Sequence, residues 1–185
     1  MDEYILNNEP NKQLPNQQAE TSRMGGIFFI FAWIAGAGLL VALFSGILER
    51  KENPNQRPNS VISEAGIEVS LLQNRMGHYV VNGEINGKSV TFLLDTGATN
   101  VSVGAHLGPE LGLMPGQQFI ALTANGRVTV AQTNISELKI GEITLSNVDA
   151  SLNPGMKSDK ILLGMSALKQ LEWTQRGDVL TLRTL

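Results

Sequence analysis

The most informative feature of the sequence is a carboxylate in an unusual place. Asp95 directly follows the apolar run Phe92-Leu93-Leu94 and is itself followed by Thr96, Gly97 and Ala98. Aspartate is depleted in β-strands and is rarely buried without a partner. An apolar strand that runs into an aspartate and a Thr-Gly turn therefore indicates a carboxylate placed for acid–base catalysis. A purely structural turn residue is the alternative.

A second motif follows downstream. Ile161-Leu162-Leu163-Gly164-Met165 places an apolar strand in front of a glycine, ahead of a short helix. With Leu93-Leu94-Asp95-Thr96-Gly97-Ala98, this order of motifs resembles the retropepsin-like aspartic proteases, and more narrowly their bacterial membrane-anchored single-domain type. The resemblance covers roughly residues 66–185 and is to one retropepsin subunit, not to a two-lobed pepsin. It implies an all-β fold, a retropepsin-like closed β-barrel with one short helix.

The resemblance also assigns roles to the residues of the first motif. Asp95, Thr96 and Gly97 are implied to be the catalytic motif. Thr96 would form a hydrogen bond across a dimer axis, and Gly97 would let two loops approach closely. Ala98 is implied to contact substrate, being small where the substrate backbone passes. No metal ion and no organic cofactor is implied.

Catalysis of this kind needs two carboxylates that share one proton, because two like charges about 3 Å apart cannot both ionise. The chain has one Asp-Thr-Gly motif, and Asp149, Asp159 and Asp178 lack that context. The sequence therefore predicts half a site per chain, completed in a homodimer by Asp95 of a second copy. The other expected partner is a peptide or protein substrate. A non-catalytic peptide-binding or dimerisation module that keeps the fold is the alternative function.

A hairpin tip is the expected cover of the site. An Asn-Gly pair between two strand-like runs favours a type I′ turn, which needs positive φ at both central positions. The tip Thr123, Ala124, Asn125 and Gly126 lies where the resembled family carries its flap, a mobile hairpin that closes over substrate. We therefore expect these four residues to bind substrate. A plain surface hairpin is the alternative.

From Val61 onward the pattern is that of an all-β domain. Asn86-Gly87 is a second hairpin signal, and the strand after it delivers Asp95. Residues 104–116 are rich in glycine and proline and are expected to form mostly loop. A short helix is expected at 165–170. The expected strands are 67–71, 79–85, 88–94, 99–103, 118–123, 127–133, 135–140, 143–152, 161–163, 172–174 and 179–183.

A long apolar stretch near the N-terminus predicts a membrane span. Gly25 to Leu48 contains no charged residue. At about 1.5 Å per residue it can cross a bilayer core of roughly 30 Å. The expected segments are a disordered polar tail (1–23), a transmembrane helix (24–48), a solvated linker (49–65) and the protease-like domain (66–185). A buried core helix and a cleaved signal peptide are the alternatives.

The flanking charges do not set the orientation of this helix. Lys12 and Arg23 precede it and Arg50, Lys51 and Arg57 follow it, so the positive-inside rule meets near balance. The resemblance implies the bacterial inner membrane, with the domain in the periplasm. It also places the closing strand Val179–Leu182 in a dimer sheet.

Composition excludes several other functions. The net charge of −3 gives no support to nucleic-acid binding. The absence of cysteine excludes disulfides, thiol nucleophiles and thiolate metal sites. The two histidines, His78 and His106, are expected to be surface or turn residues, so a histidine-rich metal site is not expected.

Overall fold

The computed structural model describes residues 18–64, 66–123 and 126–185, with the backbone alone at 18–27 and 47. The chain divides into two compact units, Met1–Ser45 and Gly46–Leu185. Most of the polar tail expected at 1–23 lies outside the described residues. Ala124 and Asn125 of the expected hairpin tip lie outside them as well.

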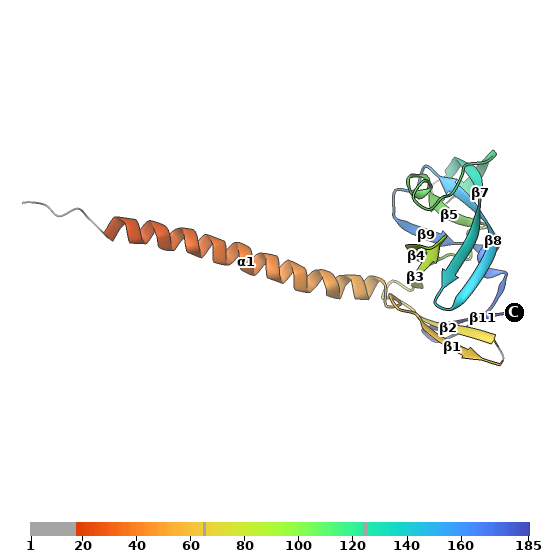
Figure 1. The fold of residues 1–185 in the computed structure, drawn as a ribbon, viewed down its shortest axis with the longest axis horizontal. Helices are drawn as coiled ribbons and strands as arrows, with labels where there is room; N and C mark the ends of the chain where they lie inside the picture. Colours follow the sequence, from red (N-terminus) through yellow and green to blue (C-terminus); the bar gives the residue numbers. More distant parts are fainter. Residues whose placement is uncertain (1–17, 65, 124–125) are drawn as a thin grey trace, which may run out of the picture. The chain divides into compact units, whose positions relative to one another are not determined.

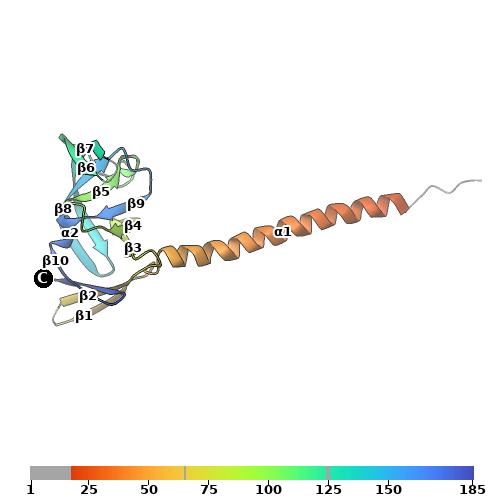
Figure 2. The ribbon, with the colours of Figure 1, turned by 180° about the vertical axis from the view of Figure 1, so that it is seen from behind.

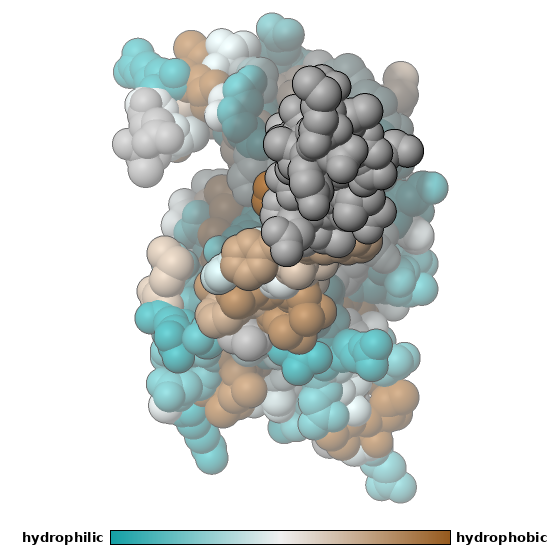
Figure 3. All heavy atoms as spheres, turned by 90° about the vertical axis from the view of Figure 1, so that its left-hand side faces the viewer, coloured by the Kyte–Doolittle hydropathy of each residue, from teal (hydrophilic) through white to brown (hydrophobic). Residues whose placement is uncertain are grey.

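The N-terminal part of the described chain is one helix, α1 (Gln18–Glu52) (Figure 1). Its segment Phe28–Glu52 has a mean hydropathy of 2.2 and no buried residue within its apolar window, so it is long and apolar enough to cross a membrane. Figure 3 shows hydrophobic residues gathered in one part of the visible surface, whereas the rest of that surface is mixed. The helix extends beyond the expected bounds 24–48 at both ends. A signal sequence shares its length and composition.

The remaining elements form a mostly β unit, as the sequence predicts. One 3-10 turn, η1 (Ala105–Leu107), and one short helix, α2 (Met165–Leu168), interrupt the strands. The strands are β1 (Asn59–Ser63), β2 (Gly66–Leu72), β3 (Val80–Ile85), β4 (Lys88–Leu94), β5 (Val101–Gly104), β6 (Gln118–Thr123), β7 (Gly126–Ile140), β8 (Ile143–Asn153), β9 (Lys160–Leu163), β10 (Leu171–Arg176) and β11 (Val179–Thr184).

Two sheets organise these strands. The larger has the order β3-β4-β9-β5-β8-β7-β6, and the smaller has the order β1-β2-β11-β10. The larger sheet is rolled, because β3 also pairs with β7 at Glu84↔Lys139 and Ile85↔Leu138. This short pairing brings the sheet close to the closed barrel that was predicted. In Figure 2, β9 lies between β4 and β5, as the pairing requires.

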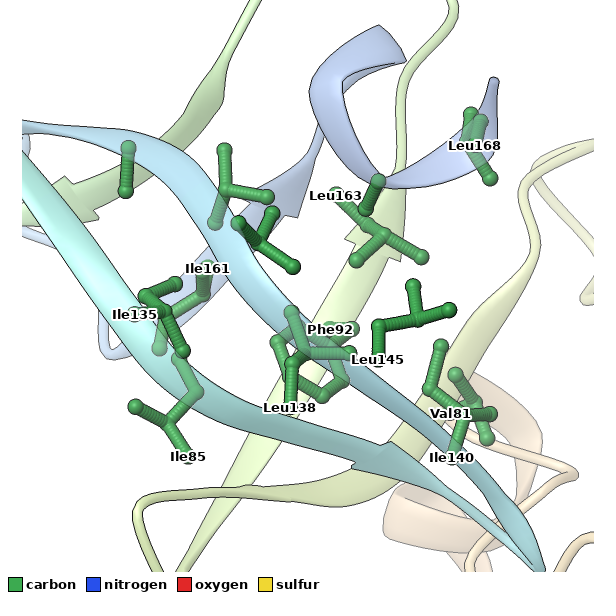
Figure 4. Packing of buried hydrophobic residues seen from close by; sticks show 14 of the residues in the cluster. Val81, Ile85, Phe92, Ile135, Leu138, Ile140, Leu145, Ile161, Leu163 and Leu168 are labelled. Atoms are coloured by element: carbon green, nitrogen blue, oxygen red, sulfur yellow. The ribbon is translucent and has the colours of Figure 1, made fainter. Parts of the chain in front are cut away.

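A single hydrophobic core fills the rolled sheet. Phe92 of β4 is fully buried, and Figure 4 shows its ring among side chains from β7, β8 and β9. Burying one such side chain contributes about 1.5–3 kcal/mol. Alternate residues of β7 and β8 face this core, including Leu138, Ile140, Ile143 and Leu145. This packing fixes the strand that ends at Asp95.

The predicted turn between β3 and β4 is confirmed. Asn86 and Gly87 both have positive φ, 50° and 76°, which is the type I′ geometry. The Asn86 side chain also donates to the Leu111 carbonyl (2.9 Å) and accepts from the Glu137 N–H (3.1 Å). The turn therefore ties the hairpin to β7 and to the loop that follows η1.

The structure differs from the sequence expectation at residues 49–65. Instead of a solvated spacer, this segment contains the end of α1, two buried asparagines and strand β1, which pairs with β2. Asn55 is 4% exposed, and its amide nitrogen donates to the carbonyls of Leu72 (2.9 Å) and Val80 (2.7 Å). Its side-chain oxygen accepts the Leu72 N–H. Expected strands 127–133 and 135–140 are likewise one continuous strand, β7.

Candidate active site

Asp95 is the first residue after β4, at a point fixed by strand pairing. β4 and β9 are parallel and end together, with Leu94 opposite Leu163. The Asp95 N–H donates to the Leu163 carbonyl (3.2 Å), which extends the ladder by one residue. The chain then crosses the end of β9 to reach β5, on the other side of β9. The carboxylate is therefore carried by a loop anchored on two buried strands.

The second motif packs directly beneath this loop. The Met165 N–H donates to the Ala98 carbonyl (2.8 Å), and the Ser166 N–H donates to the Thr99 carbonyl (2.9 Å). Gly164 provides the clearance, because a Cβ atom there would lie 2.7 Å from the Ala98 carbonyl oxygen. The structure thus brings together the two motifs that the sequence singled out.

The Asp95 carboxylate is half-buried and held by its own turn. Its Oδ1 atom accepts the Gly97 N–H at 2.9 Å, and the Ala98 N–H donates to the Asp95 carbonyl at 3.2 Å. Thr96 and Gly97 are exposed and Ala98 is partly exposed. The arrangement presents an oriented carboxylate at the surface of the domain, where it can exchange protons with a bound water or substrate.

Sequence reasoning missed one residue that supports this loop. Ser166 is 4% exposed, and its hydroxyl donates to the Asp149 carbonyl (2.7 Å) and accepts the Val101 N–H (2.9 Å). It therefore links α2, β8 and the start of β5. A serine in the first turn of a helix ordinarily suggests a local cap, so nothing in the sequence pointed to these long-range partners.

The expected flap is a hairpin made by β6 and β7. Gln118 pairs with Ala131, and Thr123 pairs with Gly126 at its end. The Thr123 hydroxyl donates to the Gly126 carbonyl (2.8 Å). Ile120 and Leu122 are 65% and 81% exposed, which is unusual for large apolar side chains of a strand pair. Such exposed apolar surface is typical of a segment that contacts another molecule.

The other acidic residues have different surroundings. Asp159 forms an ion pair with His106, with 3.0 Å between Oδ1 and Nε2, and both side chains are exposed. Asp149 lies on β8, and Asp178 lies in the turn between β10 and β11. Two cavities, of about 400 and 290 Å³, are lined by other parts of the domain and by none of residues 95–98.

Comparison with known proteins agrees with this geometry. A family model described as a gag-polyprotein putative aspartyl protease matches residues 81–170. The crystal structure of a retropepsin-like aspartic protease from Rickettsia conorii superposes with a TM-score of 0.54 and 26% sequence identity. It covers 69% of this chain and 96% of that one.

A curated relative from Sinorhizobium sp., described as an uncharacterized protein in the cobV 5′ region, is 39% identical over 125 residues. The match covers 65% of this chain and 54% of the relative, so the chain spans about half of that protein's length. The matched family region, residues 81–170, contains both motifs. In its fold, its Asp-Thr-Gly turn and these matches, the chain is similar to the retropepsin-like aspartic proteases.

Proposed function

We propose that the protein is a membrane-anchored, homodimeric aspartic endopeptidase whose catalytic dyad consists of Asp95 from each of two copies. The observation that carries this proposal is the Asp95 turn, in which a half-buried carboxylate is oriented by the Gly97 N–H and left open to solvent. The chain has one Asp-Thr-Gly motif. A complete dyad therefore requires a second copy related by a two-fold axis.

The proposed mechanism is general acid–base catalysis by the coupled pair. Two facing Asp95 carboxylates share one proton, because both cannot be ionised at close range. The ionised member takes a proton from a water held between them, and that water attacks the peptide carbonyl. The protonated member donates a hydrogen bond to the carbonyl oxygen and stabilises the negative charge that develops there. Thr96 and Gly97 hold the two loops in position, as the family resemblance implies.

The substrate is proposed to bind as an extended peptide between the Asp95 turns and the β6–β7 hairpin. An extended chain can satisfy its backbone groups against a strand edge, while alternate side chains enter pockets. The exposed Ile120 and Leu122 supply apolar contact area. Ala98 and the tip residues 123–126 are the further contacts that we propose.

Helix α1 is proposed as the membrane anchor. Confinement to one bilayer raises the effective concentration of the second copy and so favours the dimer. The family resemblance supports a bacterial inner-membrane location with the domain in the periplasm. Because the chain contains no cysteine, a single cysteine placed at exposed Ser146 would report the side of the membrane on which the domain lies. Labelling of intact spheroplasts by an impermeant maleimide is the expected result.

The decisive test of the enzyme is peptide cleavage by the full chain in detergent or in liposomes. Wild type, Asp95→Asn and Asp149→Asn are incubated with a diverse peptide mixture from acidic to neutral pH, and products are read by mass spectrometry. Asp149→Asn is the matched control, because it makes the same chemical change at an exposed carboxylate outside the motif. We expect cleavage by wild type and Asp149→Asn and none by Asp95→Asn. Equal cleavage by all three would exclude Asp95 as the catalyst.

Mixing wild type with the Asp95→Asn variant tests separately whether the active enzyme is a dimer. If each active site needs two intact Asp95 residues, activity falls with the square of the wild-type fraction, to about a quarter in an equal, freely exchanging mixture. A linear fall to half would mean that one chain suffices. Peptide binding without cleavage by any form would favour the non-catalytic binding module.

A further inference from the structure

The loop 73–78, between β2 and β3, is built around one side chain. The Asn74 Oδ1 atom accepts the backbone N–H groups of Met76 (2.9 Å) and His78 (3.0 Å). The Asn74 N–H donates to the His78 carbonyl (2.8 Å), and Gly77 adopts a positive φ of 80°. The Gln73 amide also donates to the Gly77 carbonyl (2.7 Å). These bonds hold the loop in one conformation at the domain surface.

This well-ordered loop presents apolar side chains to the outside. Met76 at its tip is 74% exposed, and Leu72 at its start is 52% exposed. Arg75, between them, is exposed as well. An apolar side chain that the backbone holds toward solvent does not stabilise the fold, because it buries no apolar area. The same side chain is stabilised when it contacts another apolar surface, and the neighbouring arginine favours one that also carries negative charge.

The loop is joined to the last turn of α1. The Asn74 Nδ2 atom donates to the Glu52 carbonyl (2.9 Å). The Glu52 carboxylate pairs with Lys160 at the start of β9 (3.0 Å), and the Asn53 N–H donates to the Glu49 carbonyl (2.8 Å). The end of the helix, the loop and β9 therefore form one local assembly within the second unit.

The position of Glu52 on the helix sets the depth of this assembly in a bilayer. The apolar run from Phe28 to Leu48 measures about 30 Å at 1.5 Å per residue, which matches the hydrocarbon core. Glu52 follows one turn later, about 6 Å beyond that boundary. The headgroup zone on each side is roughly 5–8 Å thick. With α1 as the proposed anchor, a loop hydrogen-bonded to Glu52 is therefore expected at headgroup depth.

The charges around the loop fit that environment. The exposed basic residues at the end of α1, in the segment that follows it and in the loop are Arg50, Lys51, Arg57 and Arg75. The neighbouring acidic groups are Glu49, Asp178, whose carbonyl accepts the Gln73 N–H, and Glu52, which is paired with Lys160. The excess of cations next to the end of a helix proposed to cross the membrane favours anionic lipid headgroups.

We propose that loop 73–78 is a membrane-surface contact, in which Met76 enters the interfacial zone of the bilayer and Arg75 faces anionic headgroups. The inference rests on the proposed membrane anchor, since only a helix that crosses the bilayer places Glu52 at that depth. Interfacial binding of this kind combines buried apolar area with attraction to anionic lipid. The catalytic domain would then be held against the membrane at two points, α1 and the loop.

The test uses site-directed fluorescence in liposomes that contain anionic lipid and a headgroup-attached quencher. The full chain has no cysteine, so Met76→Cys, Met114→Cys and Val41→Cys each carry one environment-sensitive label. Met114 is the matched control, because it is also a methionine, is 80% exposed and has no hydrogen bond to α1 among the described residues. Val41, in the middle of the apolar run, reports insertion of the helix through a quencher placed deep in the acyl chains.

The expected result is a blue-shifted and strongly quenched label at position 76, an unquenched label at 114, and deep quenching at 41. Deep quenching at 41 with no quenching at 76 would overturn the loop contact while leaving the anchor intact. No quenching at 41 would overturn the anchor and the loop contact together. Equal quenching at 76 and 114 would mean that the dye itself binds lipid, and the contact would be rejected.

A second pair of variants removes the label from the key side chain. His78→Cys carries the label, with Met76 either intact or replaced in Met76→Asp. The charged replacement is expected to lower quenching at position 78, because a carboxylate is disfavoured at an anionic interface. Unchanged quenching would contradict the role of Met76. Peptide cleavage by the full chain and by Asp95→Asn is measured in parallel. This distinguishes failure of the loop contact from failure of the proposed enzyme.

Discussion

Gly164 and Asn100 are in direct backbone contact: a Cβ atom on Gly164 would lie 2.3 Å from the Asn100 carbonyl oxygen. The Asn100 backbone cannot move aside as easily as the end of a flexible side chain could. Any side chain at Gly164 must therefore push β9 away from the loop that carries Asp95. The glycine sets how closely the two motifs approach.

We expect Gly164→Ala to destabilise the domain by about 1–3 kcal/mol, the usual cost of overpacking, and to abolish peptide cleavage. Thermal unfolding of the full chain in detergent measures the first effect. Gly46→Ala is the matched control, since a Cβ atom there meets nothing within 4 Å and alanine favours the helix. A wild-type Tm for Gly164→Ala would contradict the contact.

Ser166→Ala removes a hydroxyl that joins three elements. The Val101 N–H and the Asp149 carbonyl each lose their hydroxyl partner, and we expect a loss of about 1–3 kcal/mol. Hydrogen exchange at the Val101 amide should accelerate more than at amides elsewhere in the core. Ser146→Ala, at an exposed position of β8, should leave stability and exchange unchanged. Similar behaviour of both variants would refute the proposed linking role.

Asn55→Ala tests whether residues 53–63 are part of the folded domain. The substitution leaves backbone groups of Leu72 and Val80 without their side-chain partner. We expect a loss of more than about 2 kcal/mol, since each unsatisfied buried group costs about 1–3 kcal/mol. New protease-sensitive sites should also open between residues 53 and 63. Asn59→Ala, at an exposed position, should change neither stability nor protease sensitivity. If both variants resist proteolysis between residues 53 and 63, this segment is not held in the domain by Asn55.

Tyr79 makes stability depend on alkaline pH. Burial raises the pKa of its hydroxyl, and the nearby Asp178 carboxylate raises it further. In the unfolded chain the tyrosine hydroxyl has a pKa near 10. As pH rises, Tyr79 therefore ionises in the unfolded state before it ionises in the folded state. Stability should therefore be unaffected below that pH and fall as pH rises through the folded-state pKa.

Tyr79→Phe separates this effect from other alkaline titrations. The hydroxyl is buried and has no hydrogen-bond partner among the described residues. Its removal should therefore leave stability equal or higher at neutral pH. Above pH 10 the variant should lose stability less steeply than wild type in denaturant titrations. Parallel curves for the two proteins would be the contrary result.

The two motifs and the elements that carry them were predictable because their signals are local. The apolar strand before Asp95 and the apolar strand before Gly164 each stand in a few consecutive residues, and the Asn86-Gly87 turn specifies its own φ angles. The parallel pairing of β4 with β9 is not written in either strand alone and was not predicted.

What could not be predicted depends on partners distant in the sequence. Asn53 and Asn55 lie in a polar, proline-containing stretch that is typical of a solvated linker. Their burial comes from bonds to Leu72, Val80 and Asn82, which only the folded sheet brings near. Ser166 was missed for the same reason. The identity of a short polar side chain does not indicate which distant backbone groups it will hydrogen-bond in the folded protein.

The buried Asn53 and Asn55 also bear on how far from the membrane the proposed enzyme can reach. A free seventeen-residue tether, the length of the linker expected at 49–65, would have a root-mean-square end-to-end distance of roughly 23 Å. Because Asn53 and Asn55 are buried, the folded domain begins within a few residues of Glu52, and the segment after the helix is not a long tether. Proteins that diffuse far from the bilayer would then be poor targets. The enzyme would act on chains that are themselves brought to the membrane surface, such as the juxtamembrane segments of other anchored proteins.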